Sequence, residues 1–343
     1  MASSFTNSFM EKGDDSHITN SLFASVQNDL AKVDQILQND IPNQSGALKQ
    51  ITQYILNGGG KRIRPAISIL CAYLTNNLKT EIDEKQYTLA ILTELIHTAS
   101  LVHDDLLDEA DSRRGQESVH LKWNSKVSVI VGDFLFAQAS VKLGELENTE
   151  IVKTYANVLA NLCTGEISQA QNKFNLEALS WENYFTKSFS KTASLFAAAA
   201  KCSAILNDQD AETINKLHDF GKNLGLAFQI IDDLLDYTAD EKNLGKPLMG
   251  DLSQGIFTAP FLYAFEDDVN RNTLRTIISR RFSDTNDLNK VKDIIMLANG
   301  FEKTQKLAES FIERAQKNIE ETPQSKFKED LLKLSAYILT RDL

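Results

Sequence analysis

The chain has 343 residues and a net charge of −11, from 47 Asp and Glu against 36 Lys and Arg. This acidic balance excludes the basic surface that nucleic-acid binding needs. Hydrophobic residues make up 42% of the sequence, which is enough for a sizeable core. No run of about 18 apolar residues predicts a transmembrane helix. The three cysteines are scattered, so they predict neither a disulfide framework nor a zinc site.

Residues 1–20 are polar and unpatterned, and we expect them to be a disordered tail. They lack the apolar core of a secretory signal. Two compartments remain open for the protein. One is the cytoplasm of a bacterial-type cell, and the other is a plastid if this segment is a trimmed transit peptide. No long linker interrupts the rest of the chain, so we expect residues 21–343 to form a single domain.

Most of the remaining chain has the pattern of helices. Pro and Gly are sparse, and apolar residues recur three and four positions apart. In chain order, this spacing predicts helices over 22–36, 87–107, 127–146, 151–170, 191–206, 214–237, 258–265, 287–297, 302–319 and 326–339. We therefore expect an all-α, single-domain bundle of long helices around a deep central cavity, because large bundles commonly build metal sites between facing core helices.

The string Asp-Asp-Leu-Leu-Asp occurs twice, at residues 104–108 and 232–236. Residues i and i+4 share a helix face, so Asp104 would lie beside Asp108 and Asp232 beside Asp236. Like charges at this spacing repel each other. Mg²⁺, which binds through one or two carboxylates plus substrate phosphates, would relieve that repulsion. One copy alone is more typical of a solvated helix face, whereas two copies facing one cavity predict a clamp for several Mg²⁺ ions and a diphosphate.

Basic side chains stand both before and after the first acidic helix in the sequence. Lys61 and Arg64 follow a run of glycines, which lets the backbone approach a ligand closely. Arg offers phosphate a planar fork of donors, and Lys offers a point charge. The alternative for this cluster is an ordinary basic turn or helix start. Arg113 and Arg114 follow the first motif, and they would serve two different phosphate groups or form salt bridges with nearby carboxylates.

Further polar groups flank the two acidic motifs. His97 lies seven residues before Asp104, on roughly the same helix face, where it would contact a diphosphate or serve as a core histidine. The remaining candidates around the two acidic clusters are Lys191, Thr192, Gln229 and Lys246.

Together these motifs form a recognisable series. In chain order they are GGK and RP within 59–65, HTASLVHDD with a third Asp over 97–108, RRG at 113–115, GDFL at 132–135, GEI at 165–167, KTAS at 191–194, FQIIDD with a third Asp over 228–236, and GKP at 245–247. The series resembles the trans-type isoprenyl diphosphate synthase family from about residue 22 to the C-terminus. FLFAQ at 134–138 and FTAP at 257–260 are similar to long-chain solanesyl diphosphate synthases of the cyanobacterial and plastid type. The string LMGD at 248–251 departs from the small residues usual before that aspartate.

The resemblance implies a homodimer with Mg²⁺ as the cofactor, three ions per active site. It implies metal ligands at Asp104, Asp108, Asp232 and Asp236, although Asp236, like Asp105 and Asp233, would also fit a supporting role. The allylic diphosphate would contact Arg113, Lys191, Thr192, Gln229 and Lys246. Isopentenyl diphosphate would contact Lys61, Arg64, His97 and Arg114. The residues implied to be catalytic are Asp104, Asp105, Asp108, Lys191, Asp232, Asp233 and Lys246.

The implied reaction joins isopentenyl diphosphate to farnesyl or geranylgeranyl diphosphate by ionisation, condensation and elimination. The growing tail would run from Asp104 back along its own helix, past Ser100, Ala99 and Ile96. Because Ser100 and Ala99 are small, we expect a long-chain all-trans product, with Phe134 of the next helix as a candidate floor. The alternative is that these small residues only allow close helix packing.

Three other functions remain as alternatives. A geranylgeranyl diphosphate synthase, with a C20 product, would differ only in the tunnel floor. A regulatory subunit of a heteromeric synthase would usually lose one or both acidic motifs, and both are intact here. A terpene cyclase would need no isopentenyl site, so Lys61, Arg64 and His97 count against it.

Overall fold

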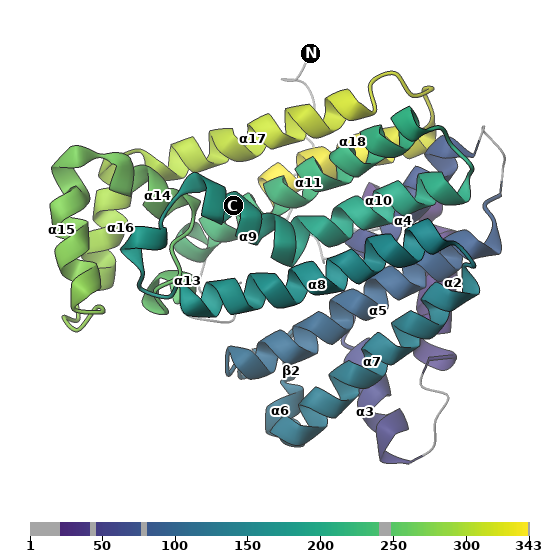
Figure 1. Cartoon of the computed structure of the whole chain (residues 1–343), viewed down its shortest axis with the longest axis horizontal. Coiled ribbons are helices and arrows are strands. Elements are labelled where there is room, and N and C mark those ends of the chain that lie inside the picture. The colour runs from purple at the N-terminus through teal and green to yellow at the C-terminus, as the bar shows by residue number, and fades with distance from the viewer. Residues whose placement is uncertain (1–20, 42–45, 77–80, 240–247, 342–343) are drawn as a thin grey trace.

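The computed structural model describes residues 21–41, 46–76, 81–239 and 248–341, and these are almost entirely helical (Figure 1). The all-α prediction is therefore confirmed. From the N-terminus the elements are η1 (Ala24–Val26), α2 (Gln27–Asn39), α3 (Ala47–Leu56), α4 (Ile63–Thr75), α5 (Glu84–Leu107), β1 (Ser112–Arg113), β2 (Gln116–Glu117), α6 (Val119–Lys122), α7 (Ser125–Glu145), α8 (Thr149–Gln171) and η2 (Leu176–Ala178). They continue with α9 (Trp181–Ser188), η3 (Phe189–Ala193), α10 (Ser194–Leu206), α11 (Ala211–Thr238), α13 (Gly250–Ser253), α14 (Ala259–Glu266), α15 (Asp268–Ser279), α16 (Asp287–Leu297), α17 (Gly300–Asn318) and α18 (Lys326–Thr340).

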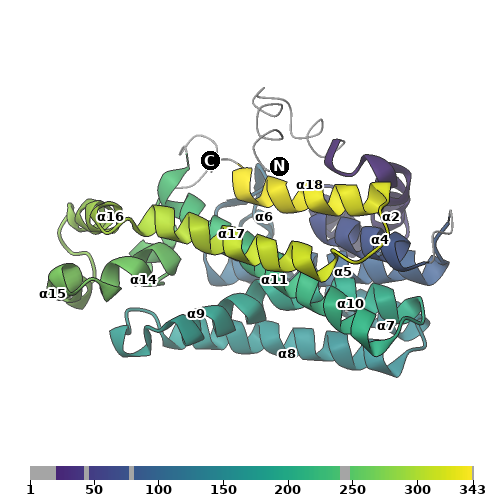
Figure 2. The ribbon, with the colours of Figure 1, turned by 90° about the horizontal axis from the view of Figure 1, so that it is seen from above.

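Long helices pack in layers around α10 and α11. In Figure 2, α17 and α18 lie on one side of this pair, and α8 and α9 lie on the other. The approach of α10 to α11 is close because α11 has glycine at the contact. A Cβ on Gly221 would lie 2.4 Å from the carbonyl oxygen of Phe196. The alanines of α10 are buried against this surface, and they keep the central layer thin.

The helices that periodicity predicts are present, with ends shifted by a few residues. Among the described residues, six further α-helices were not predicted: α3, α4, α9 and α15, and the four-residue α6 and α13. Almost every residue of α4 is buried. The segment is short and apolar almost throughout, and a short apolar run is typical of a buried strand as well as of a buried helix. This is why the helix that follows the basic cluster was not predicted.

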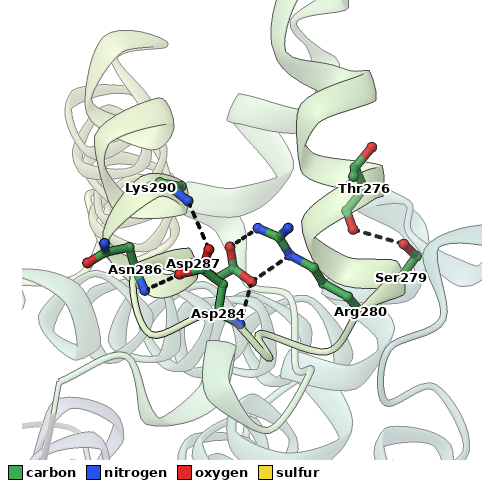
Figure 3. A network of polar contacts seen from close by, with 7 residues as sticks. All are labelled: Thr276, Ser279, Arg280, Asp284, Asn286, Asp287 and Lys290. Carbon is green, nitrogen blue, oxygen red and sulfur yellow. Dashed lines mark hydrogen bonds and ion pairs between the residues drawn. The ribbon is translucent and has the colours of Figure 1, made fainter.

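The α15–α16 turn is held by a polar network (Figure 3). The Asp287 carboxylate has no exposed surface, and it accepts a 2.8 Å hydrogen bond from Arg280 Nε and a 3.2 Å bond from the Asp284 amide. Arg281 and Phe282 between them adopt positive φ. Because a buried carboxylate is costly unless paired, these bonds fix the path of the chain between the two helices.

One helix among the described residues, α7, is long and apolar enough to cross a membrane by length and composition alone. The expectation concerned unbroken apolar runs, and α7 is not one, because Asp133 and Gln138 interrupt it. In this fold α7 packs lengthwise against α5. Its outer side carries exposed Ile130 and Val141.

Candidate active site

The first acidic motif lies at the C-terminal end of α5. Asp104 is in the last turn, and Asp108 caps the helix, its amide bonded to the Asp104 carbonyl at 2.8 Å. Asp105 points elsewhere, is buried, and accepts a 2.8 Å hydrogen bond from Arg113 Nε. Asp104 and Asp108 are therefore the members left to face a ligand, while Asp105 anchors an arginine.

The two arginines after this motif lie on a tight β-hairpin, not on a helix. Strands β1 and β2 are joined through Arg114 and Gly115, both at positive φ, as a two-residue hairpin turn requires. The Arg113 side chain turns to Asp105, while Arg114 Nη1 donates to the carbonyl oxygen of Gly59. The two side chains therefore point to different partners, and of the two predicted alternatives the structure shows a salt bridge for Arg113; their contacts with phosphate groups stay a prediction.

The basic cluster before α4 separates into different directions. Arg62 is buried in ion pairs with Asp34 and Glu94, at 2.6 and 2.8 Å. Lys61 Nζ instead donates to the Tyr337 hydroxyl of α18 at 2.7 Å. Arg62 therefore has a structural role, and Lys61 faces the C-terminal helix.

Arg64 and His97 meet between α4 and α5, where Arg64 Nη1 and His97 Nε2 lie 2.9 Å apart. Burial, followed by the charge of Arg64, lowers the pKa of His97 well below its usual value. Burial also lowers the pKa of Arg64 to about 10. The imidazole is therefore neutral and accepts a hydrogen bond from a charged guanidinium.

Lys191 and Thr192 lie in η3, a single π-helical turn between α9 and α10. Such turns are frequent at functional sites. Lys191 Nζ pairs with Glu166 of α8 at 2.5 Å. Thr192 Oγ1 lies 2.5 Å from Gln229 Oε1 of α11. One turn thus connects α8 to the helix of the second acidic motif.

The second motif continues this chain of contacts. Gln229 Nε2 donates to Asp233 Oδ1 at 2.8 Å, and the Tyr184 hydroxyl donates to Asp233 Oδ2 at 2.6 Å. Burial raises the pKa of Asp233 to about 7. With both oxygens occupied, Asp233 positions Gln229 and Thr192.

Asp236, the last member of the second motif, is also engaged. Its two carboxylate oxygens accept the amides of Gly250 and Asp251 at 3.1 and 3.2 Å. Met249, the residue before Gly250, is buried and has a positive φ of 59°. The LMGD string therefore places a buried Met249 just before the two amides that bond Asp236. These bonds favour a supporting role for Asp236. Lys246, predicted for the same loop, lies outside the described residues.

Asp232 has a partner that the sequence did not indicate. Arg341, which follows the last residue of α18, reaches it through Nη2 at 2.5 Å. The sequence does not point to this contact, because Arg341 stands more than 100 positions from Asp232 in the chain. Glu166 was also missed, although it stands within the GEI string.

Of the predicted tunnel residues, Ile96, Ala99 and Ser100 lie on α5 and Phe134 lies on α7. Ala99 and Ile96 are buried, and Phe134 of α7 is partly buried against the core. Ser100 Oγ donates to the His97 carbonyl at 2.9 Å. Small side chains therefore occupy the turn before Asp104, and their role in setting product length stays a prediction.

Negative charge accumulates at the end of α5. Burial first, and Glu166 second, raise the pKa of Asp104 to about 7, although Lys191 acts in the opposite direction. Within the described residues, no three His, Cys, Asp or Glu side chains converge enough to hold a metal ion by themselves. A site with only one or two carboxylate ligands fits a hard cation such as Mg²⁺, which takes its remaining ligands from phosphates and water.

The sequence is similar to that of known proteins over most of its length. The family model described as polyprenyl synthetase matches residues 45–295. A prenyl transferase of Cyanophora paradoxa is 41% identical over 94% of this chain and 98% of its own length. Solanesyl diphosphate synthase 2, chloroplastic, of Arabidopsis thaliana is 38% identical over 93% of this chain and 76% of its own.

Solved structures have the same fold. Heptaprenyl diphosphate synthase from Staphylococcus aureus superposes with a TM-score of 0.87 at 32% identity, covering 93% of this chain and 99% of its own. A polyprenyl synthase from Caulobacter crescentus, complexed with calcium and isoprenyl diphosphate, gives 0.86 at 30% identity, covering 95% and 98%. From this likeness and from its own motifs, the chain belongs to the polyprenyl synthetase family of trans-prenyltransferases.

Proposed function

We propose that this enzyme condenses isopentenyl diphosphate with farnesyl or geranylgeranyl diphosphate, in the presence of Mg²⁺, to give a long-chain all-trans polyprenyl diphosphate. The observation that carries the proposal is the π-turn η3. Lys191 of this turn pairs with Glu166, whose charge acts on Asp104 of the first motif, and Thr192 contacts Gln229 beside the second. The two acidic motifs thus share one set of diphosphate-binding side chains.

In this proposal Asp104, Asp108 and Asp232 hold the metal, with three Mg²⁺ ions per active site. Asp105, Asp233 and Asp236 support them, because their oxygens accept bonds from Arg113, Gln229 and backbone amides. The allylic diphosphate would contact Arg113, Lys191, Thr192, Gln229 and Lys246. Isopentenyl diphosphate would contact Lys61, Arg64, His97 and Arg114.

Each group has a task in the reaction. When bound, Mg²⁺ supplies positive charge that neutralises the departing diphosphate. Lys191 and Thr192 hold that diphosphate in line with the tunnel. Arg64, kept charged, and neutral His97 orient the second diphosphate. Ionisation breaks the allylic C–O bond, the isopentenyl double bond attacks the cation, and a proton leaves to the departed diphosphate. The apolar walls exclude water, which would quench the cation.

Product length depends on the tunnel along α5. Ala99 and Ser100 leave the first turn below Asp104 open, and Ile96 and Phe134 follow further down. Relatives named solanesyl and decaprenyl diphosphate synthases support a product longer than C20. A geranylgeranyl diphosphate synthase is the second candidate, supported by structures of that name with the same fold at 22–28% identity.

A homodimer would cover the exposed apolar side of α7 and α8. Ile130 and Val141 on α7, and Val152 and Ile167 on α8, are each more than one-third exposed. Such a patch is typical of an interface between subunits. For the compartment, chloroplastic and cyanobacterial relatives keep both the plastid and the bacterial cytoplasm as proposals. Residues 1–20 lie outside the described residues.

A product assay tests the proposal. Purified protein would receive Mg²⁺, labelled isopentenyl diphosphate and either farnesyl or geranylgeranyl diphosphate, and the products would be sized by chromatography and mass. We expect a product longer than C20 that is lost in EDTA. A product that stops at C20 would support the second candidate. Absence of incorporation by folded protein would overturn the enzyme proposal and favour a regulatory subunit.

A further inference from the structure

A polar pocket lies between the C-terminal end of α8 and the helix α9, which contact each other in the bundle (Figure 2). Gln169 and Asn172 of the α8 end, Tyr184 and Lys187 of α9, and Phe257 before α14 are among its walls. Of the described residues that line it, Lys187 is the one positive charge, and none is Asp or Glu. In a chain with a net charge of −11, such a lining suits an anion.

The pocket extends from the second acidic motif to solvent. Tyr184 is buried and donates its hydroxyl to Asp233 at 2.6 Å. Burial raises the pKa of Asp233, and the charge of Lys187 acts in the opposite direction, so this ammonium is near enough to affect the motif. Asn175 and Asn183, which also line the pocket, are exposed.

Lys187 and Gln169 stand about one helical turn from the pair formed by Lys191 and Glu166. Lys187 precedes Lys191 by four residues, and Gln169 follows Glu166 by three. Residues at these spacings are neighbours on a helix, about 5–6 Å apart. The inner lysine is paired with a carboxylate at 2.5 Å, whereas the outer turn of α8 offers an uncharged amide instead.

The outer lysine keeps its donors unused. Lys187 Nζ makes no ion pair or hydrogen bond within the part of the chain that the structure describes, and it lies 5.8 Å from the centre of the Tyr184 ring. The side-chain amide of Gln169 has no hydrogen-bond partner there either. Asn172 is already engaged, because its Nδ2 donates to Ser168 Oγ at 3.3 Å. A half-buried ammonium and a nearby amide are therefore available to a ligand.

We propose that this pocket receives inorganic diphosphate, the second product of the condensation, with Lys187 as its charged ligand and the Gln169 amide as a second donor. This inference rests on the proposed function. An ammonium is a point charge that binds phosphate oxygens from several directions, so it suits a ligand that passes through. A diphosphate that leaves Lys191 meets Lys187 one turn further out.

The reaction gives this pocket a task. Each condensation leaves the released diphosphate beside Lys191, while the lengthened chain keeps the diphosphate that came with isopentenyl diphosphate. A long-chain product needs repeated condensations, so the allylic subsite must be cleared in every round. A second lysine one turn outward lowers the cost of moving this anion through an acidic protein. Lys187 thus acts on clearance of the subsite and not on formation of the carbon–carbon bond.

Calorimetry with both substrate subsites filled tests this. The full chain is saturated with Mg²⁺, isopentenyl diphosphate and the thiolo analogue of farnesyl diphosphate as an unreactive pair, and inorganic diphosphate is then titrated in. We expect the wild type to bind inorganic diphosphate without releasing the analogue. Because a charge-assisted hydrogen bond is lost, Lys187→Met should weaken this binding at least about tenfold. Affinities for the analogue and for isopentenyl diphosphate should stay as in the wild type.

Steady-state inhibition gives a second readout. With both substrates saturating, inorganic diphosphate should still inhibit the wild type, and Lys187→Met should need at least about tenfold more of it for the same inhibition. Lys303→Met is the matched control, because Lys303 lies 5.7 Å from the centre of the Tyr263 ring but does not line the pocket. It should match the wild type in both measurements.

If Lys187→Met fails to fold, Lys187→Gln carries the test with the same expectation. The inference would be overturned by a wild type that binds no inorganic diphosphate beside the unreactive pair, or binds it only by displacing the analogue. Wild-type affinity in the Lys187 variants would overturn it as well. A wild type that binds neither the analogue nor isopentenyl diphosphate would instead overturn the proposed function.

Discussion

The hydroxyl groups of Thr93 on α5 and Tyr155 on α8 lie 2.6 Å apart in the buried core. Thr93 stands eleven residues before Asp104, and Tyr155 stands eleven before Glu166. Eleven residues are three helical turns, or roughly 16 Å at 1.5 Å per residue. The two helices therefore carry the acidic site at one end and a hydrogen-bonded pair three turns below it, which is where a tail growing from Asp104 would meet a floor.

Tyr155→Ala should lengthen the product, because it removes the side chain that bridges α5 and α8. Product sizes from radiolabelled incubations would be compared with those of Tyr155→Phe, which keeps the ring and loses only the hydroxyl. We expect the phenylalanine variant to match the wild type. Since truncating a buried aromatic residue costs about 3–5 kcal/mol, folding of the alanine variant should first be verified by circular dichroism. An unchanged product from a folded alanine variant would exclude Tyr155 as the floor.

Ala99→Phe or Ser100→Phe should shorten the product. An aromatic ring at either position would fill the turn directly below Asp104, so the tail would stop early. Ser100→Ala is the small-for-small control, and its product distribution should stay as in the wild type. If both phenylalanine variants are folded, active and still make the wild-type product, the tail does not run along this side of α5.

The interior of the site was only partly predictable. Asp104, Asp232, Lys191 and Gln229 could be chosen because carboxylate spacing and family motifs are properties of short strings. Arg341 could not, because its contact with Asp232 depends on how α18 packs across the bundle. The hairpin at Arg114 was missed for another reason. The sequence gives no sign that two consecutive residues adopt positive φ when only one of them is glycine.

Asp104→Asn should stabilise the metal-free protein at alkaline pH. The folded-state pKa of Asp104 is about 7, above the unfolded value of 3.8, so the wild type loses stability as pH rises from 3.8 to 7. The asparagine variant avoids this cost, which is on the order of 1–3 kcal/mol above pH 7. Thermal unfolding in EDTA should give a larger gain at pH 8 than at pH 5.5. An equal gain at both pH values would contradict the raised pKa.

Arg62 and Arg64 should respond differently to the same substitution. Arg62→Met leaves Glu94 buried without its partner, so the free energy of unfolding should fall by about 3–5 kcal/mol. Arg64→Met should instead weaken isopentenyl diphosphate binding, with a smaller change in stability. Urea unfolding and calorimetry on both variants separate these effects. The reverse result would assign the ligand to Arg62.

The central claim is that both acidic motifs hold one metal–diphosphate group. Farnesyl diphosphate binding, measured by calorimetry with Mg²⁺ and without isopentenyl diphosphate, tests it through Asp104→Asn, Asp232→Asn and the double variant. We predict that each single change weakens farnesyl diphosphate binding at least about tenfold. The double variant should bind almost as tightly as the single variant with the lower affinity, because the losses of binding free energy are not additive for residues that act on one group. Fully additive losses, or a single variant that binds farnesyl diphosphate as tightly as the wild type, would contradict the claim.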